Sequence, residues 1–383
     1  MRVYADNAAT TRVSKTALDA MMPYFTEVYG NPSSLHTFGQ EAKEALENAR
    51  ERIAAHLGCQ PREIYFTSGG SEADNQAIIS AAKLGERKGK KHIISTAFEH
   101  HAVLHTLKKL EKQGFEITLL PVHENGVVDV KELEAAIKDE TILVTVMTVN
   151  NEIGTIQPIA EIGKLCHDKG VLFHTDAVQA VGHVKIDVKE QNIDMLSLSG
   201  HKFHATKGIG ALYCKKGIRL PNLIEGGAQE SGRRAGTENI PGIVGYAKAC
   251  EIAKANMDNH IETLTKLRTK LIDGILEKIP YTKVNGSLEH RLPGNVNFSF
   301  EFIEGEGILL MLDMLGIAAS SGSACTSGSL DPSHVLLAIG LPHEIAHGSL
   351  RLTLSEENTE EEIDYALSVM REVIPMLQKY TRR

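Results

Sequence analysis

Short apolar runs that predict buried strands alternate with helical patterns along the first 215 residues. The run that begins at Thr141 is apolar without polar alternation, which is typical of a parallel strand covered on both faces. Strands that alternate with helices build a doubly wound α/β domain with a mostly parallel sheet. In such a domain, functional groups gather where the strands end. The runs lie at residues 64–66, 92–96, 141–149, 171–173 and 195–198.

Lys202 lies in a turn between two predicted strands. It follows the small and polar residues Ser199, Gly200 and His201 and precedes Phe203. A lysine amine in such a place is suited to a Schiff base with an aldehyde cofactor. The plainer alternative is a lysine that caps a loop.

Polar side chains also follow two of the other predicted strands. Asp176 comes just after the run 171–173, where a carboxylate can keep the nitrogen of a pyridoxal ring protonated. Taken alone, Asp176 equally fits a helix N-cap. His100 and His101 follow the run 92–96, and a histidine there can lie on a cofactor ring and move protons at neutral pH. The residues alone do not choose between these two histidines.

A glycine turn and a helix start follow the strand at 64–66. Backbone N–H groups and the dipole at such a helix start favour a phosphate, which makes Gly70 and Ser71 candidate phosphate ligands. Ser71 and Asp74 also have a spacing close to that of a capping box, so an ordinary capped helix is the alternative.

Four segments together resemble one enzyme family. They are HTDAVQ at residues 174–179, SGHKF at 199–203, RAGTEN at 234–239 and SSGSACTS at 320–327. In order and spacing they resemble the cysteine desulfurases, which are fold-type-I pyridoxal-phosphate enzymes of the class V aminotransferase group. The resemblance covers essentially the whole chain. It implies a large doubly wound domain over residues 16–255 and a smaller α+β domain over residues 1–15 and 256–383.

The resemblance also implies roles for single residues. Lys202 would bear pyridoxal 5'-phosphate, and His100 rather than its neighbour would lie on the ring. Asn151 and Arg351 would hold the substrate carboxylate, although a rim salt bridge is the alternative for Arg351. Thr237 would contact the phosphate of a cofactor in a second subunit, which implies a homodimer. The implied cofactor-binding residues are Gly70, Ser71, His100, Asn151, Asp176, Gln179, Ser199, Gly200, His201, Lys202 and Thr237.

Cys325 lies in a run of small residues, 318–329, that is almost entirely Ala, Ser, Gly and Thr. Such a run buries little surface, so we expect it to be mobile and its thiol to be accessible. The resemblance makes Cys325 the sulfur acceptor and admits it as a transient iron–sulfur ligand; it implies no other metal site. The other cysteines lie in apolar patterns and are expected to be inert: Cys59, Cys166, Cys214 and Cys250.

The implied reaction takes sulfur from L-cysteine, leaves L-alanine and places a persulfide on Cys325. An iron–sulfur scaffold or another sulfur-acceptor protein would then collect the sulfur. The alternatives are a selenocysteine lyase, another pyridoxal-phosphate enzyme of the class V aminotransferase type, and a non-catalytic protein that keeps the fold. The set Lys202, Asp176, His100 and Arg351 argues against a non-catalytic protein, because a docking surface needs no electron sink.

Charge and hydropathy exclude some partners. The formal net charge is −8 and no basic stripe is present, so we expect no nucleic-acid partner. No apolar stretch is long enough for a membrane span, and the N-terminal residues lack the apolar region of a signal peptide. The expected location is therefore the cytoplasm.

Overall fold

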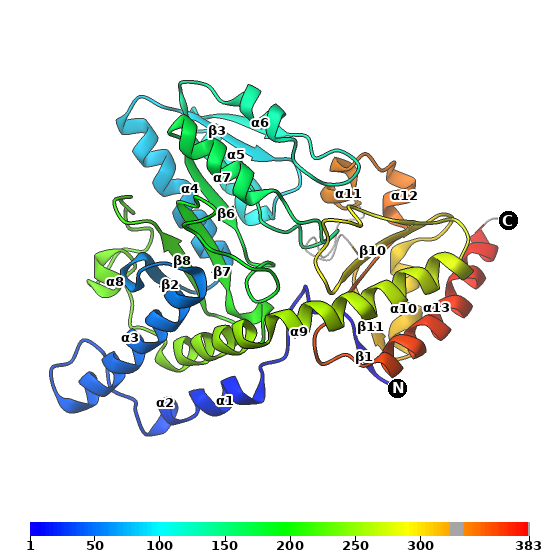
Figure 1. Ribbon diagram of the computed structural model, residues 1–383, viewed down its shortest axis with the longest axis horizontal. Coiled ribbons are helices and arrows are strands. Elements are labelled where there is room, and N and C mark those ends of the chain that lie inside the picture. The colour runs from blue at the N-terminus through cyan, green and yellow to red at the C-terminus, as the bar shows by residue number, and fades with distance from the viewer. Residues whose placement is uncertain (322–331, 382–383) are drawn as a thin grey trace.

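The computed structural model describes residues 1–321 and 332–381. The predicted Cys325 and most of its loop therefore lie outside the described residues. Figure 1 shows a large part built on a central sheet and a smaller part at the other end of the molecule. The long helix α9 (Ile240–Lys278) runs from one part to the other.

The large part is built on a seven-stranded sheet with the order β2-β8-β7-β6-β5-β3-β4. Neighbouring strands from β4 to β7 are parallel, whereas β8 runs antiparallel to both β7 and β2. The predicted α/β fold with a mostly parallel sheet is therefore confirmed. The strands are β2 (Ile64–Thr67), β3 (His92–Thr96), β4 (Glu116–Leu120), β5 (Thr141–Thr145), β6 (Leu172–Asp176), β7 (Met195–Ser199) and β8 (Gly210–Cys214).

Helices cover both faces of this sheet. Successive residues of a strand point to opposite faces, so Leu212 packs with α4 and α5 while Tyr213 packs with α3 and α9. Because both faces are buried, the strands carry apolar residues without alternation, as the sequence indicates. The helices of this part are α1 (Lys15–Met21), α2 (Pro23–Thr26), α3 (Thr37–Leu57), α4 (Gly70–Arg87), α5 (His101–Glu111), α6 (Val130–Ala136), α7 (Ile159–Lys169) and α8 (Gln229–Gly232), with short 3-10 turns at Pro61–Glu63 and Gly200–Lys202.

The smaller part has its own core. Its antiparallel sheet places β10 (Asn295–Phe300) between β12 (Ser349–Thr353) and β9 (Thr282–Val284). The chain start joins this part, because β1 (Val3–Tyr4) pairs with β11 (Ile317–Ala318). The same hydrophobic core contains Val3, Leu264, Phe298 and Ile374. The remaining helices are α10 (Gly305–Met314), α11 (His334–Ala338), α12 (His343–His347) and α13 (Glu360–Thr381).

Two helix starts differ in how they are capped. At α13, Thr359 and Glu362 form a capping box, with reciprocal bonds of 3.2 and 3.1 Å. At α4, the predicted box of Ser71 and Asp74 is wrong, because the N-cap is Gly69 and Ser71 lies inside the first turn. The Glu72 carboxylate instead accepts a bond from the Ser68 N–H at 2.8 Å.

No helix in the described ranges 1–321 and 332–381 combines the length and the apolar character that a bilayer-spanning helix requires.

Candidate functional site

A cavity of about 290 Å³ lies where β6 and β7 end, between the first turn of α4 and β12. Most of the predicted site residues line it, although they come from distant parts of the sequence. Gly200 is buried just behind it, and Thr237 is exposed elsewhere. The lining residues are Ala8, Ala9, Gly70, Ser71, Asp74, His100, Met147, Asn151, Asp176, Val178, Gln179, Ser199, His201, Lys202 and Arg351.

Lys202 follows β7 in a strand-turn-strand arrangement, as predicted. Its amine donates to the carbonyl oxygens of Ala8 at 2.5 Å and Ala9 at 3.0 Å. The Gln179 amide donates to the same Ala8 oxygen at 3.0 Å. The N-terminal segment therefore reaches the lysine.

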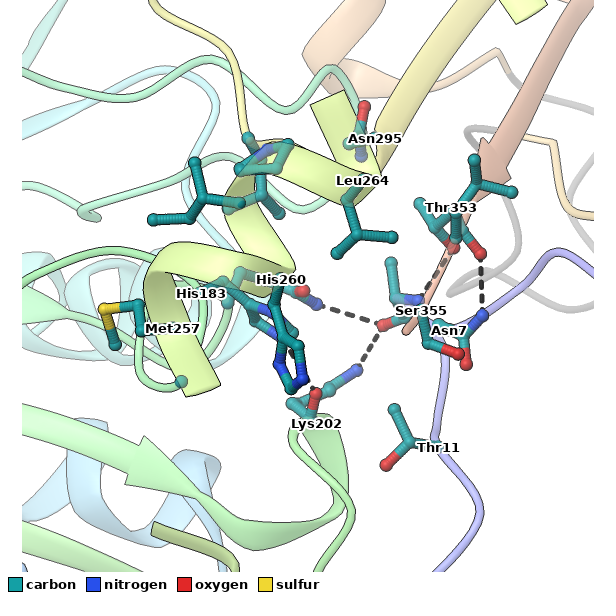
Figure 2. A pocket seen from close by; sticks show the side chains of 18 residues that line it. Asn7, Thr11, His183, Lys202, Met257, His260, Leu264, Asn295, Thr353 and Ser355 are labelled. Atoms are coloured by element: carbon teal, nitrogen blue, oxygen red, sulfur yellow. Dashed lines mark hydrogen bonds between the residues drawn. The ribbon is translucent and has the colours of Figure 1, made fainter. Parts of the chain in front are cut away.

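A second, smaller cavity lies on the other side of Lys202. Figure 2 shows it between Lys202, the N-terminal segment with Asn7, and the α9 side chains Met257, His260 and Leu264. Its volume is about 30 Å³, and a water molecule requires about 10–15 Å³ by the same measure. It is too small for a cofactor ring, whereas the cavity of about 290 Å³ brings together most of the predicted site residues and is the candidate active site.

Asp176 ends β6 at the floor of the larger cavity. Its Oδ1 accepts the Val178 N–H at 2.9 Å, and the side chain is buried. Burial raises the pKa of Asp176, while the Val178 N–H and the Lys202 amine act in the opposite direction. An acidic group held in this way can pair with a positively charged ring nitrogen.

His100 caps the start of α5. Its Nδ1 accepts the Ala102 N–H at 3.1 Å, so the neutral ring carries its proton on Nε2. Burial lowers the pKa of His100, which leaves the ring neutral and able to accept a proton at pH 7. His101 does not line the cavity; it is half-buried and packs against the rings of His105 and His334.

The first turn of α4 forms the other end of the cavity. The first N–H groups of a helix have no partner within the helix, so Gly70 and Ser71 suit a phosphate here. A Cβ atom at position 70 would lie 2.5 Å from Val178 Cγ2, so a larger residue would require Val178 or the nearby backbone to shift. Arg234 binds the Glu72 carboxylate at 2.9 Å and ties the segment 234–239 to this helix.

Arg351 reaches the cavity from β12 in the smaller part. Its guanidinium donates to the Asn151 carbonyl at 3.1 Å and to the Asp6 carboxylate at 3.0 Å. Its Nε has no hydrogen-bond partner within residues 1–321 and 332–381. Arg351 and Asn151 were predicted site residues, whereas Asp6 was not, because its only signal in the sequence is its place in a polar N-terminal loop.

The cysteines of the described residues are poor nucleophiles. Cys59, Cys166, Cys214 and Cys250 are all buried and unpaired, as expected. Burial raises the pKa of the first three thiols to about 12 and that of Cys250 further. A reactive thiol must therefore come from outside the described residues, where Cys325 is the remaining cysteine.

The proteins that resemble this chain in sequence belong to one enzyme family. Residues 3–366 match the family described as aminotransferase class-V. A protein of Clostridium botulinum named cysteine desulfurase IscS is 57% identical over 390 residues, which cover 100% of this chain and 98% of the relative. A protein of the same name from Methanosarcina thermophila is 56% identical over 376 residues, 98% of this chain and 93% of the relative.

Solved structures of similar proteins superpose closely on this chain. A structure described as a NifS-like protein superposes with a TM-score of 0.92 at 40% identity, covering 98% of this chain and 100% of the other. One described as SspA in complex with cysteine superposes with a TM-score of 0.82 at 38% identity, covering 94% and 100%.

Proposed function

This chain belongs to the class-V aminotransferase family and is a cysteine desulfurase, and on that premise we propose which of its residues carry out the reaction. The observation that supports the assignment best is the single cavity that contains Lys202, Asp176, His100 and Arg351. Each of these side chains comes from a different element, and together they offer an amine, an acid, a base and a carboxylate-binding group.

Pyridoxal phosphate is the cofactor of this family, and the cavity fits its parts. The first turn of α4 would hold the phosphate, Asp176 the ring nitrogen and Lys202 the aldehyde carbon. Gln179 would donate to the phenolic oxygen, with Ser199, Gly200 and His201 shaping the floor. When bound, the protonated ring takes up the electron pair that is released as a substrate bond to Cα breaks.

Arg351 and Asn151 would orient L-cysteine. Arg351 keeps Nε for the substrate carboxylate, while Asp6 and the Asn151 carbonyl fix the plane of the guanidinium. Lys202 would take the Cα proton and return a proton later. His100, which is neutral because burial lowers its pKa, would accept the proton of the Cys325 thiol.

Cys325 would accept the sulfur. Its thiolate forms a bond to the substrate sulfur, and the substrate Cβ–S bond breaks with its electron pair moving to Cβ. Protonation of that carbon gives alanine, so one cysteine and one thiol become one alanine and one persulfide. We propose that an iron–sulfur scaffold or another acceptor protein removes the sulfur.

We propose that the active unit is a homodimer. Large apolar side chains are exposed over residues 22–38, which a second copy of the chain would cover. Thr237 is also exposed, and in a dimer it would reach the phosphate of the partner subunit's cofactor. The exposed fractions are 54% for Met22, 56% for Phe25, 66% for Tyr29, 92% for Leu35 and 50% for Phe38.

Two further assignments are proposals. We propose residues 16–255 as the large domain and residues 1–15 with 256–383 as the small one, since Val3 and Phe298 share a core separate from that of the large sheet. We propose the cytoplasm as the compartment, because free thiols persist where the surroundings are reducing and the four described cysteines are free.

The decisive experiment is incubation with L-cysteine followed by mass spectrometry of the peptide that contains Cys325. We expect one added sulfur atom on that peptide. Cys325→Ser should keep the cofactor but nearly stop alanine and sulfide formation, with Cys59→Ser as the control variant. Alanine formation by Cys325→Ser at the parent rate would show that Cys325 is not the sulfur acceptor.

A further inference from the structure

Asp74 is a buried acid that the proposed reaction does not use. It lies on α4, one turn after Gly70 and Ser71, and is 1% exposed. It lines the same cavity as Asp176, and its Oδ1 lies 3.7 Å from Nε2 of His174, which is on the same strand as Asp176 and two residues before it. Its Oδ1 accepts no hydrogen bond from any described residue. Two buried acids therefore meet at the floor of the cavity.

A neutral histidine lies behind this pair. The two ring nitrogens of His174 bond to the hydroxyls of Thr145 at 2.8 Å and Ser197 at 2.9 Å. The same Nε2 is 3.7 Å from Asp74 Oδ1. Burial lowers the pKa of His174 to about 3, so the ring has no positive charge at pH 7 to offset a second carboxylate.

The other charges near the pair act differently on its two members. Asp176 is close to Lys202 and accepts the Val178 N–H, and both favour its ionised form. Asp74 instead faces the buried Glu99 and Asp176. Burial and the charge of Asp176 raise the pKa of Asp74 well above its ordinary value. Two buried carboxylates that line one small cavity do not both ionise, so one proton remains, and we place it on Asp74.

We propose that Asp74 is a protonated positioning residue that donates its carboxyl proton to Asp176 as a hydrogen bond and so keeps Asp176 ionised beneath the cofactor ring. This inference rests on the proposed function, in which Asp176 holds the ring nitrogen. A donor stabilises the Asp176 anion and makes it a weaker base, so that the proton shared with the ring stays on the ring.

The test compares three holoenzymes: wild type, Asp74→Asn and Asp74→Leu. Asparagine keeps a donor without a charge, whereas leucine has the same branching and number of side-chain heavy atoms but is larger and has no donor. The pH midpoint of the visible absorbance band of the bound cofactor is measured in each. The midpoint of Asp74→Asn should lie within about 0.3 pH unit of the wild-type midpoint. The midpoint of Asp74→Leu should be higher by about one unit, which is a tenfold change in the proton equilibrium. The midpoint rises because a ring without its proton no longer repels the proton on the imine nitrogen.

Two outcomes would overturn the proposal. Equal shifts in Asp74→Asn and Asp74→Leu would mean that Asp74 acts through a negative charge, and no shift in either would mean that it only packs. An infrared difference spectrum gives a readout that needs no turnover. The carbonyl stretch of a protonated carboxylic acid should be present in wild type and lost in Asp74→Asn; its absence from wild type would also refute the proposal.

A control separates this proposal from the proposed function. If Asp176→Asn leaves the absorbance midpoint unchanged, the assignment of Asp176 to the ring nitrogen fails, while the infrared band still reports the proton on Asp74. Thermal unfolding of Asp74→Leu checks that the variant folds. If Asp74→Leu does not fold, the infrared band and the absorbance midpoint of Asp74→Asn still test whether Asp74 is protonated.

Discussion

Replacing Glu230 by glutamine should destabilise the protein, because it removes the two-point counter-ion of the buried Arg50 and leaves only the more distant and exposed Glu47 carboxylate, at 3.7 Å, as an ion-pair partner. Two nitrogens of the Arg50 guanidinium donate to the two oxygens of Glu230, at 2.8 and 2.9 Å. The exposed fractions of these side chains are 10% and 2%. The guanidinium also donates to the Ile64 carbonyl at 2.6 Å and lies 4.8 Å from the centre of the Phe66 ring. Glu230 in turn accepts the Phe66 N–H at 2.9 Å.

The expected loss of folding free energy depends on which contacts of Glu230 each substitution leaves in place. Removing one partner of a buried ion pair costs about 3–5 kcal/mol. Glutamine keeps one acceptor oxygen, so Glu230→Gln should be near the lower end, about 3 kcal/mol. Glu230→Ala also leaves the Phe66 N–H without an acceptor, which adds about 1–3 kcal/mol. Position 230 has a φ of 48°, but all three residues share this strained backbone, so its cost cancels.

The assay is urea unfolding followed by far-ultraviolet circular dichroism, since the chain has no tryptophan, with equal cofactor loading in every sample. The matched control is the exposed pair of Arg52 and Glu251, at 3.1 Å with exposed fractions of 52% and 46%. Glu251→Gln should cost less than about 1 kcal/mol. A double variant, Arg50→Met with Glu230→Leu, should lose less stability than the two single variants together. If Glu230→Gln is as mild as Glu251→Gln, the reasoning about a buried charge is wrong.

Three further outcomes are expected. Borohydride reduction and peptide mapping should place the cofactor on Lys202, and finding it on Lys207 would refute the assignment. Arg351→Lys should raise KM for L-cysteine by about tenfold or more with a smaller change in kcat, because the two-point fork is lost; an unchanged KM would contradict this. His204 and Glu356 form an ion pair at 3.3 Å. Burial by itself would lower the pKa of His204 and raise that of Glu356, but the attraction between the two charges outweighs it. The pKa of Glu356 is therefore lowered to about 2, and the pKa of His204 is raised. The pair should therefore stabilise the fold fully between about pH 4.5 and 6.5. That stability should fade as pH falls from 4.5 toward 2 and as pH rises through the raised pKa of His204, and His204→Gln should flatten this profile of Tm against pH.

Local patterns were enough to predict which residues end the strands. Asp176 and Lys202 lie at the carboxyl ends of β6 and its parallel neighbour β7, and that adjacency follows from the doubly wound sheet. Partners that come from distant segments could not be predicted in this way. Asp6 and Arg351 are 345 positions apart and meet because β1 and β12 lie in the same small part, a matter of tertiary packing. The position of Asp74 in the cavity could not be predicted for a related reason. The residues at the start of a helix indicate how it is capped, but they do not indicate which strand ends lie next to it.

Packing also explains a departure from the family pattern at the start of α4. The resembled family usually has Ala-Thr where this chain has Gly70 and Ser71. The space that an alanine methyl would need at position 70 is taken by Val178, whose Cγ2 would lie 2.5 Å from it. A valine side chain is stiff at χ1, so an alanine at 70 would require the Val178 side chain or the nearby backbone to shift. Positions 70 and 178 therefore share one volume, and the choice at either is coupled to the other. The Ser71 side chain does not occupy this space. A hydroxyl group therefore remains at position 71, beside the N–H groups of the first helical turn that have no partner within the helix.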